Sequence, residues 1–434
     1  MLRFSLSATA LAFVLAACDP ATSTPPPSAA CPAPANGPTI HRGPIEASET
    51  WTADTGPHIV PQTISVRAGA TLNIEPCSVV QVDPGAGFDV AFPGTPTTGS
   101  LLAIGTAEKT IRFEGKSGAA WNGIRVDTGA TVRLANVTIE NAGAIGAAII
   151  VSGDGTRPVH KNLFVDHVTI KSSKGAGVRL ERDAAFIDGS DALTITDSAS
   201  FPLETDEHGI GSLPRGTYTG NADDRVFIDP TGPLTESATM KELGLPYLVG
   251  NFPGDSLVIG EALEKPLATL TVEAGVRVEF FPGTAFEIEH STGDKAASGA
   301  LVAVGTALAP IVFTSSKDAP AKGDWQGLWF GGIPNAANSI QHARIEYTGA
   351  DCGCILSTCS AIDRSEGAVI FTAQPARAFI EDTVVAHADS HAVVLGYEGD
   401  VVDFQPGITT EDVAGCEQTR PSAPICESPR PACM

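Results

Sequence analysis

The chain has 434 residues, of which 43% are hydrophobic and 18% charged, so it is long enough and apolar enough to bury a large core. Its 27 Lys and Arg residues against 50 Asp and Glu residues give a net charge of −23, which repels nucleic acid and argues against a nucleic-acid partner. The 45 Gly and 32 Pro residues, with few helix-like periodic stretches, predict short strands joined by turns and hence an all-β body.

The N-terminus has the pattern of a secretory signal. Arg3 precedes an apolar run from Leu6 to Ala17, and small residues stand directly before Cys18. This run is short for a membrane-spanning helix, which takes about 20 apolar residues, and no later segment is long and apolar enough to span. Residues 1–17 are therefore predicted to be a signal peptide that directs export.

The sequence Leu15-Ala16-Ala17-Cys18 resembles the lipobox of bacterial lipoproteins, in which the cysteine is diacylated and becomes the first mature residue. The resemblance implies a lipid anchor at Cys18 in the cell envelope, facing the periplasm or the cell exterior. Several acyl chains, at about 0.8 kcal/mol per buried methylene, would make a lasting anchor. An ordinary signal peptide that leaves Cys18 as a thiol is the alternative. Asp19 resembles the enterobacterial signal for inner-membrane retention, but sorting rules differ between bacteria, so the choice of membrane stays open.

A Pro-rich stalk follows the predicted anchor. Residues 18–42 are rich in Pro, Ala, Ser and Thr and include Pro25-Pro26-Pro27. Such a composition cannot bury enough apolar surface to fold, so an extended segment is expected here.

Two copies of one long unit follow the stalk. Residues 56–90 align without a gap on residues 254–288, and the match continues at slightly different spacings, as where Trp121-Asn122-Gly123 meets Trp325-Gln326-Gly327. Self-similarity of this kind is the signature of a repeat architecture. The predicted organisation is a first copy at 43–182, a connecting segment at 183–250, a second copy at 251–400 and a Cys- and Pro-rich tail at 401–434.

Within each copy the smaller unit is an apolar, polar, apolar triplet, as at residues 72–74, 80–82 and 88–90, bounded by Gly, Pro, Asn or Asp. Alternation with a period of two turns one face inward and the other outward. An antiparallel sandwich would alternate as well, but its strands usually run longer and its hairpins favour Asn-Gly or Asp-Gly turns. A solenoid of short strands, in which stacked turns supply the core, fits the pattern better.

One set of segments resembles secreted proteins with right-handed parallel β-helix repeats, in the pectate-lyase-like superfamily. The segments are Thr269-Leu270-Thr271-Val272-Glu273-Ala274-Gly275, Gly305-Thr306, Ile311-Val312-Phe313-Thr314-Ser315 and Gly323-Asp324-Trp325-Gln326-Gly327-Leu328. The resemblance covers roughly residues 50–400 and implies a right-handed parallel β-helix built from two long repeats. It does not decide function, since lyases, hydrolases, adhesins and inert scaffolds share this coil.

Superfamily enzymes that cut acidic polysaccharides place Ca²⁺-binding carboxylates on adjacent coils, beside a basic residue that abstracts a proton. The nearest match is Asp166-His167, and its duplicate, Glu381-Asp382, keeps the acid and loses the histidine. Other acids recur between the copies, whereas a catalytic pair should be unique to one place. We interpret Asp166 as a solvated turn acid, and we expect no catalytic residue and no lyase or hydrolase activity.

Ligand-type side chains stand at every second residue in the segment His387-Ala388-Asp389-Ser390-His391. On one strand the three side chains would share a face and could hold a metal. The first copy has Ser172, Lys174 and Ala176 at the matching positions, and no fourth ligand is evident. Turn histidines on the surface are the favoured interpretation, so neither a metal nor another cofactor is expected.

The cysteines other than Cys18 suggest disulfides, because their number is even and the chain is exported. They are Cys31, Cys77, Cys352, Cys354, Cys359, Cys416, Cys426 and Cys433. A bond from Cys31 to Cys77 would tie the stalk to the first coil, and the six others are expected to pin the tail across the last coils. A zinc site built on Cys352, Cys354 and Cys359 is the alternative, although their spacing is irregular and the compartment is oxidising.

Trp329 is the candidate surface contact. It is the middle residue of the triplet 328–330, which should face outward, and its duplicate in the first copy is Arg125. An outward Trp can stack on a sugar ring or fill a partner's pocket. Burial under the insertion at residues 351–360 is the alternative.

The function favoured by the sequence is a non-catalytic envelope lipoprotein that presents a rigid β-helical surface for adhesion. Its expected partners are the membrane, through the lipid anchor, and a polysaccharide or a surface protein. The alternative from another class is a polysaccharide lyase or glycoside hydrolase of the pectate-lyase-like superfamily. A structural spacer without a ligand is the third hypothesis.

Overall fold

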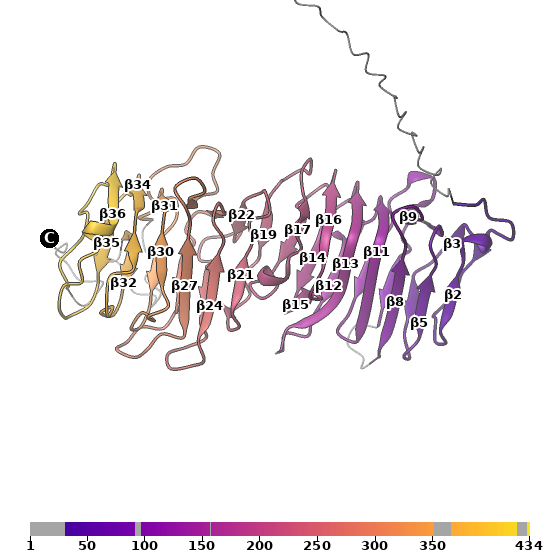
Figure 1. Cartoon of the computed structure of the whole chain (residues 1–434), viewed down its shortest axis with the longest axis horizontal. Coiled ribbons are helices and arrows are strands. Elements are labelled where there is room, and N and C mark those ends of the chain that lie inside the picture. Colours follow the sequence, from indigo (N-terminus) through magenta and orange to yellow (C-terminus); the bar gives the residue numbers. More distant parts are fainter. Residues whose placement is uncertain (1–30, 92–96, 157, 351–365, 423–431) are drawn as a thin grey trace, which may run out of the picture.

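A computed structural model describes residues 31–91, 97–156, 158–350, 366–422 and 432–434. The body is an elongated stack of short strands whose turns follow one another along a single long axis (Figure 1). The fold is all-β and agrees with the right-handed parallel β-helix predicted from the sequence. Within these residues, no helix has the length and apolar character needed to cross a membrane.

The first part of the coil is built on two sheets with parallel pairing. The N-terminal sheet has 12 strands: β1 (Thr39–Ile40), β2 (Glu49–Trp51), β3 (His58–Val60), β5 (Thr71–Ile74), β6 (Val79–Val82), β8 (Gly99–Ile104), β9 (Ile111–Gly115), β11 (Ala130–Glu140), β13 (His160–Lys171), β15 (Ala184–Phe186), β16 (Asp191–Thr196) and β18 (Gly216–Thr217).

A second sheet, which we call the continuous sheet, runs the whole length of the body. Its 13 strands are β4 (Ile64–Val66), β7 (Phe88–Val90), β10 (Ile124–Val126), β12 (Ala147–Ser152), β14 (Ala176–Glu181), β17 (Leu203–Thr205), β19 (Val226–Ile228), β22 (Tyr247–Val249), β25 (Arg277–Phe280), β28 (Ile311–Ser315), β31 (Ala343–Glu346), β34 (Thr383–Ala386) and β36 (Ile408–Glu411).

Two further sheets complete the turns of the second part. The six-stranded sheet holds β20 (Pro233–Leu234), β23 (Leu257–Ile259), β26 (Phe286–Ile288), β29 (Leu328–Phe330), β32 (Gly367–Phe371) and β35 (His391–Leu395). The five-stranded sheet holds β21 (Ala238–Met240), β24 (Ala268–Val272), β27 (Gly299–Val304), β30 (Ser339–Gln341) and β33 (Ile380–Glu381). Four short 3₁₀ turns lie between strands: η1 (Ala53–Thr55), η2 (Lys116–Gly118), η3 (Ile210–Ser212) and η4 (Gln405–Gly407).

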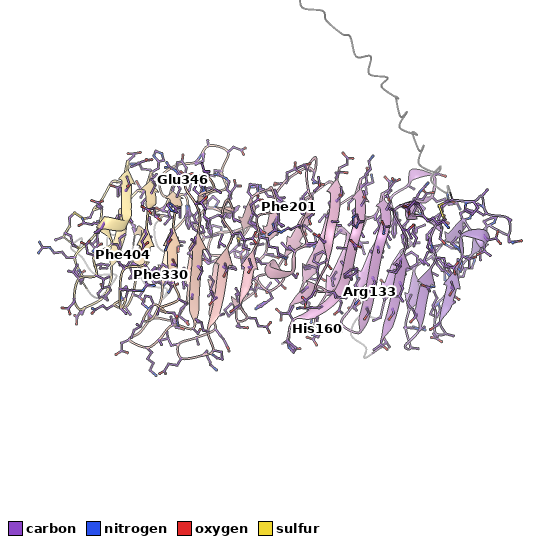
Figure 2. The ribbon with its side chains drawn as sticks, in the orientation of Figure 1. Arg133, His160, Phe201, Phe330, Glu346 and Phe404 are labelled. Atoms are coloured by element: carbon purple, nitrogen blue, oxygen red, sulfur yellow. A yellow bond between two sulfur atoms is a disulfide. The ribbon has the colours of Figure 1, made fainter. Side chains whose placement is uncertain are left out.

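The apolar positions of the triplets form columns along the axis, as the alternation predicts. Leu72, Leu101, Val132 and Leu163 pair in register across β5, β8, β11 and β13, and all four are fully buried. In the second copy a different inner column, on the six-stranded sheet, is aromatic: Phe330 lies 5.1 Å from Phe371, and Phe371 lies 4.7 Å from Phe404, between ring centroids. Figure 2 places Phe330 and Phe404 near the C-terminal end of the body. One uninterrupted core therefore supports both copies.

The two copies use the continuous sheet differently. In the first copy it contains the third strand of each turn, as in β7 with Phe88, whereas the duplicate residue Phe286 lies on β26 of the six-stranded sheet. In the second copy it contains the second strand, as in β25 with Val278, whose duplicate Val80 lies on β6 of the N-terminal sheet. The continuous sheet is thus formed by the third strand of each turn in the first copy and by the second strand of each turn in the second copy.

The exchange takes place in the segment predicted to connect the copies, which is itself coiled. The N-terminal sheet ends at β18, while the six-stranded and five-stranded sheets begin at β20 and β21. Between these turns, within residues 158–350, strand pairing is carried by β19 and β22 of the continuous sheet alone. We call this region the junction.

The coil also extends beyond the predicted boundary at residue 400. Strand β36 pairs with β34, with Ile408 facing Thr383 at one end and Glu411 facing Ala386 at the other. The first part of the predicted tail is therefore a further strand of the continuous sheet. Gln418 then bridges to Val393, and Thr419 to Cys433. The tail lies against the last turn, as expected of a cap.

The N-terminal turn is closed by an aromatic cluster. The ring of His41 stacks on Trp51 with centroids 3.8 Å apart, and its Nε2 lies 3.0 Å from Nδ1 of His58. Burial, reinforced by the charge of His58, lowers the pKa of His41 from 6.5 to about 4. Burial also lowers the pKa of His58, against the opposing effects of the Thr52 carbonyl and Glu49.

We expect this cluster to make the N-terminal turn acid-sensitive. The folded-state pKa of His41 lies below its unfolded value of 6.5, so the unfolded chain binds more protons between pH 6.5 and about 4. The stability contributed by the neutral pair is therefore complete above pH 6.5 and is lost as the pH falls toward 4. Urea unfolding at several pH values would measure this slope. In His41→Phe, which keeps an aromatic ring beside Trp51, the slope should be shallower. Parallel slopes in both proteins would contradict the assignment.

Candidate functional site

A cleft opens on the side of the body where the junction interrupts a stack of strands. The chain after β17 forms η3 in place of a strand, so that η3 separates β15 from β21. The Phe186 amide of β15 donates to Ser212 Oγ at 3.1 Å, and Gly211 lies against Ala238 of β21. The missing strand leaves a hollow of about 430 Å³ above η3, within the size range of ligand sites.

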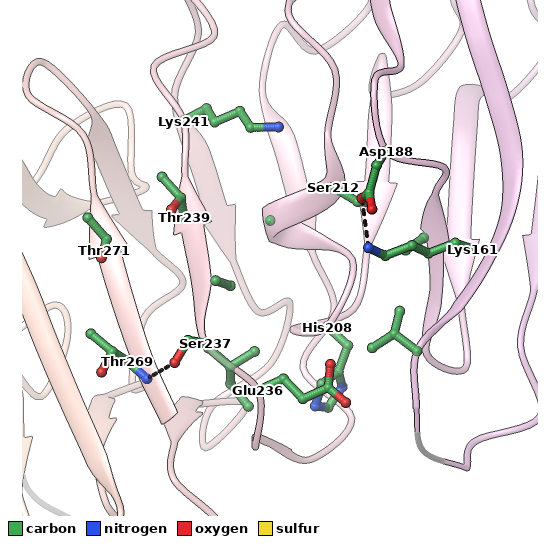
Figure 3. Close-up of a pocket in the computed structure, with 15 residues that line it drawn as sticks. Lys161, Asp188, His208, Ser212, Glu236, Ser237, Thr239, Lys241, Thr269 and Thr271 are labelled. Atoms are coloured by element: carbon green, nitrogen blue, oxygen red, sulfur yellow. Dashed lines mark hydrogen bonds and ion pairs between the residues drawn. The ribbon is translucent and has the colours of Figure 1, made fainter. Parts of the chain in front are cut away.

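Polar side chains from both sides of the junction line this cleft (Figure 3). They are Lys161, Asp188, His208, Ser212, Glu236, Ser237, Thr239, Lys241, Thr269 and Thr271. Figure 3 shows Lys241 toward one end of the cleft and His208 with Glu236 toward the other. The hydroxyls, ammonium groups and carboxylates of this lining suit a ligand rich in hydroxyl groups, because each can donate hydrogen bonds to it or accept them from it.

Several of these groups are held in place by neighbours. Lys161 Nζ lies 2.7 Å from Asp188 Oδ1, and Ser237 Oγ accepts the Thr269 amide at 3.0 Å. Lys241 Nζ donates to the Leu213 carbonyl at 2.7 Å. Burial, reinforced by the charge of Arg215, lowers the pKa of Lys241. The cleft is thus rigid and carries one amine that loses its proton more easily than an ordinary lysine.

A group of fully buried ionisable side chains lies beneath the cleft. His208 Nδ1 is 2.8 Å from Asp183 Oδ1 and 3.0 Å from Glu207 Oε1. Glu207 Oε2 also accepts the Thr231 amide at 2.8 Å. We call Asp183, Glu207 and His208 the junction triad. Its three ligand-type atoms lie within 4.8 Å of one another, and it is the one such group of His, Cys, Asp and Glu in the described part of the chain.

Asp206 organises the backbone around the junction triad. Its carboxylate accepts the amides of Asp183 at 2.7 Å, His208 at 3.0 Å and Gly209 at 3.1 Å. Burial nevertheless raises the pKa of Asp206. Burial alone would raise the pKa of Glu207 as well, but hydrogen bonds from His208 and Thr231 outweigh it and lower that pKa. The junction triad was not predicted from the sequence, where the run Asp206-Glu207-His208 is its signal.

Trp329 is not the surface contact that its outward position indicated, and the alternative, a buried side chain, describes it. The side chain does lie at an outward position of β29, but Trp329 is only 6% exposed and packs with Ile370 and Val394. These residues are in register with it on β32 and β35. Its neighbours in register are Glu287 on β26 and Ile370 on β32, so the indole packs among the outward side chains of adjacent strands and is not a surface contact.

The two motifs weighed for chemistry do not form sites. Asp166 Oδ1 lies 2.7 Å from Nδ1 of His167 on the surface and both side chains are substantially exposed, but the two residues lie within β13 and not in a turn before a strand. Strand β35 begins only at His391, so His387 and His391 do not share a strand. His387 pairs with Asp412 at 3.0 Å, whereas the buried His391 accepts the amide of Cys416.

Two disulfides are present among the described residues. Cys31 bonds to Cys77, as suggested for the stalk, and Cys416 bonds to Cys433 within the tail. The remaining predictions on cysteines, at Cys18, Cys352, Cys354, Cys359 and Cys426, fall outside the described residues.

The geometry defines a parallel β-helix protein with a polar cleft at its junction. Residues 257–354, from β23 to beyond β31, match the family model described as a pectate-lyase-like beta helix domain. This match lies within the second copy and agrees with the superfamily resemblance noted in the sequence. No curated protein and no solved structure matches the chain.

Proposed function

We propose that the protein is a non-catalytic carbohydrate-binding protein of the cell envelope, held at the membrane through Cys18 and binding its ligand in the junction cleft. The observation that carries the proposal is the cleft itself, a hollow of about 430 Å³ lined by hydroxyl and charged side chains. The cleft belongs to the interrupted stack at η3 and is therefore not a feature that recurs with every turn.

The walls of the cleft favour a sugar over an apolar ligand. Thr239 and Thr271 pair in register on β21 and β24, so their outward side chains present two neighbouring hydroxyls on a rigid surface. The amines of Lys161 and Lys241 offset the carboxylates of Asp188 and Glu236, so the lining is less acidic than a chain whose net charge is −23. A neutral or acidic oligosaccharide would find hydrogen-bond partners here that the remainder of this acidic surface offers less readily.

The test is calorimetric binding of neutral and uronic-acid oligosaccharides to the full chain. In the double variant Thr239→Val, Thr271→Val, the loss of two hydroxyl hydrogen bonds should weaken binding about tenfold or more, at about 1 kcal/mol each. The matched control is Thr138→Val, Thr169→Val, a pair in register on β11 and β13 away from the cleft. Equal affinity in both double variants would contradict a site in the cleft.

A lyase is the second candidate, because one observation favours it. Elimination from a uronic acid requires a base, and Lys241 lies in the cleft with a pKa that burial and the charge of Arg215 lower. An assay for unsaturated products decides between the two. We expect no product with or without Ca²⁺. Product that disappears in Lys241→Ala and persists in Asp166→Ala would replace the binding proposal by an elimination reaction in the cleft.

A further inference from the structure

We propose that the junction triad, Asp183, Glu207 and His208, binds one divalent transition-metal ion of the zinc type and thereby joins successive turns at the junction. The triad is a mixed donor set of one imidazole and two carboxylates, buried in the interior of the body. The side chains of Asp183, Glu207 and His208 are 9%, 1% and 1% exposed.

The donor atoms already converge. His208 Nδ1 lies 2.8 Å from Asp183 Oδ1 and 3.0 Å from Glu207 Oε1. In a tetrahedral zinc site with bonds of about 2.1 Å, neighbouring ligand atoms are about 3.4 Å apart. An ion would therefore require each carboxylate oxygen to move outward by only a few tenths of an ångström.

Charge favours an ion at this place. The imidazole of His208 carries at most one hydrogen on Nδ1, and one N–H cannot make full hydrogen bonds to carboxylate oxygens of two different residues. The third acid, Asp206, lies next in the chain and is itself only 2% exposed. Buried carboxylates in excess of their cationic partners are costly, and coordination to a metal is one of the ways in which proteins offset that cost.

The donor types select the kind of ion. Imidazole with carboxylates suits zinc and its neighbours in the first transition series, and zinc sites commonly use three protein ligands. Calcium takes six to eight oxygen ligands. Here one of the three donors is nitrogen, Glu207 Oε2 accepts the Thr231 amide, and the Asp206 carboxylate accepts three backbone amides. The set therefore fits a small transition-metal ion better than Ca²⁺.

The position explains what the ion would do. Asp183 follows β14, Glu207 and His208 follow β17 one turn later, and Thr231, which holds Glu207, follows β19. An ion in the triad would link two successive turns directly, and a third through Thr231, just before the point where strand pairing narrows to β19 and β22. His208 also lines the cleft, which gives the ion a route from solvent.

The experiment uses the full chain stripped of metal with a chelator and dialysed. Zn²⁺ titrated by calorimetry should bind with one equivalent per chain and raise the unfolding temperature, because a ligand of the folded state stabilises it. Co²⁺ in the same site should give the visible absorption of a nitrogen- and oxygen-ligated ion. Asp183→Asn and His208→Gln should each weaken Zn²⁺ binding at least tenfold.

The matched control is His290→Gln. His290 pairs with Glu287 at 2.6 Å but lies on the surface with its side chain 56% exposed, and this variant should bind Zn²⁺ as the parent does. The wild-type titration tests the proposal even if a triad variant fails to fold. Absence of stoichiometric Zn²⁺ binding to the folded wild-type chain, or equal binding by the folded triad variants, would overturn the proposal.

Discussion

Replacing Trp325 by alanine is expected to lower the free energy of unfolding by about 3–5 kcal/mol, the range for removal of a fully buried indole. Trp325 is fully buried, its ring stacks on Phe280 with centroids 4.1 Å apart, and its Nε1 donates to the Glu346 carbonyl at 2.8 Å. Alanine would leave a cavity between turns and a buried carbonyl without this donor. Chemical denaturation of the folded variant measures the loss.

Two other tryptophans make the prediction specific. Trp121, its duplicate, is fully buried and donates to the Glu140 carbonyl at 2.8 Å, so Trp121→Ala should cost as much. Trp329 lies in a small outer cluster and its Nε1 has no hydrogen-bond partner within the described residues, so Trp329→Ala should cost less. A loss in Trp325→Ala no larger than in Trp329→Ala would show that the inner columns do not dominate stability.

Replacing Cys18 by serine is expected to move the protein from the membrane fraction to the soluble fraction. The anchor we propose depends on acyl chains that contribute about 0.8 kcal/mol per buried methylene, and serine cannot be acylated in the same way. Detergent partition of the protein produced in a bacterial host that processes lipoproteins measures the change. The double variant Cys31→Ser, Cys77→Ser removes a disulfide but keeps Cys18 and should stay with the membrane. Retention of Cys18→Ser there would refute the anchor.

Much of the fold could be predicted because its rule is local. Alternation in segments such as residues 80–82 predicts which side chains face inward, and Val80 and Val82 are indeed fully buried around an outward Gln81. Duplication of residues 56–90 predicts a second set of turns. The exchange of sheets at the junction could not be predicted this way, because it depends on how η3 replaces one strand and on which neighbour β19 then meets.

The candidate site was harder to predict than the fold because its residues are brought together by contacts between turns. Asp183 is separated from Glu207 and His208 by most of one turn, and only stacking brings these residues together. For Trp329, strand alternation predicts the direction of the side chain but not which residues pack over it. Ile370 on β32 and Val394 on β35 are distant from Trp329 in the sequence but pack with it in the structure.

The narrowing of strand pairing to β19 and β22 has a mechanical consequence. In each copy, a load along the axis is shared by hydrogen-bonded ladders on several sides of the coil, but between the turns of β18 and β20 one ladder bears it. Bending stiffness falls where ladders are lost, so the rod is expected to bend most easily at its middle, near β19.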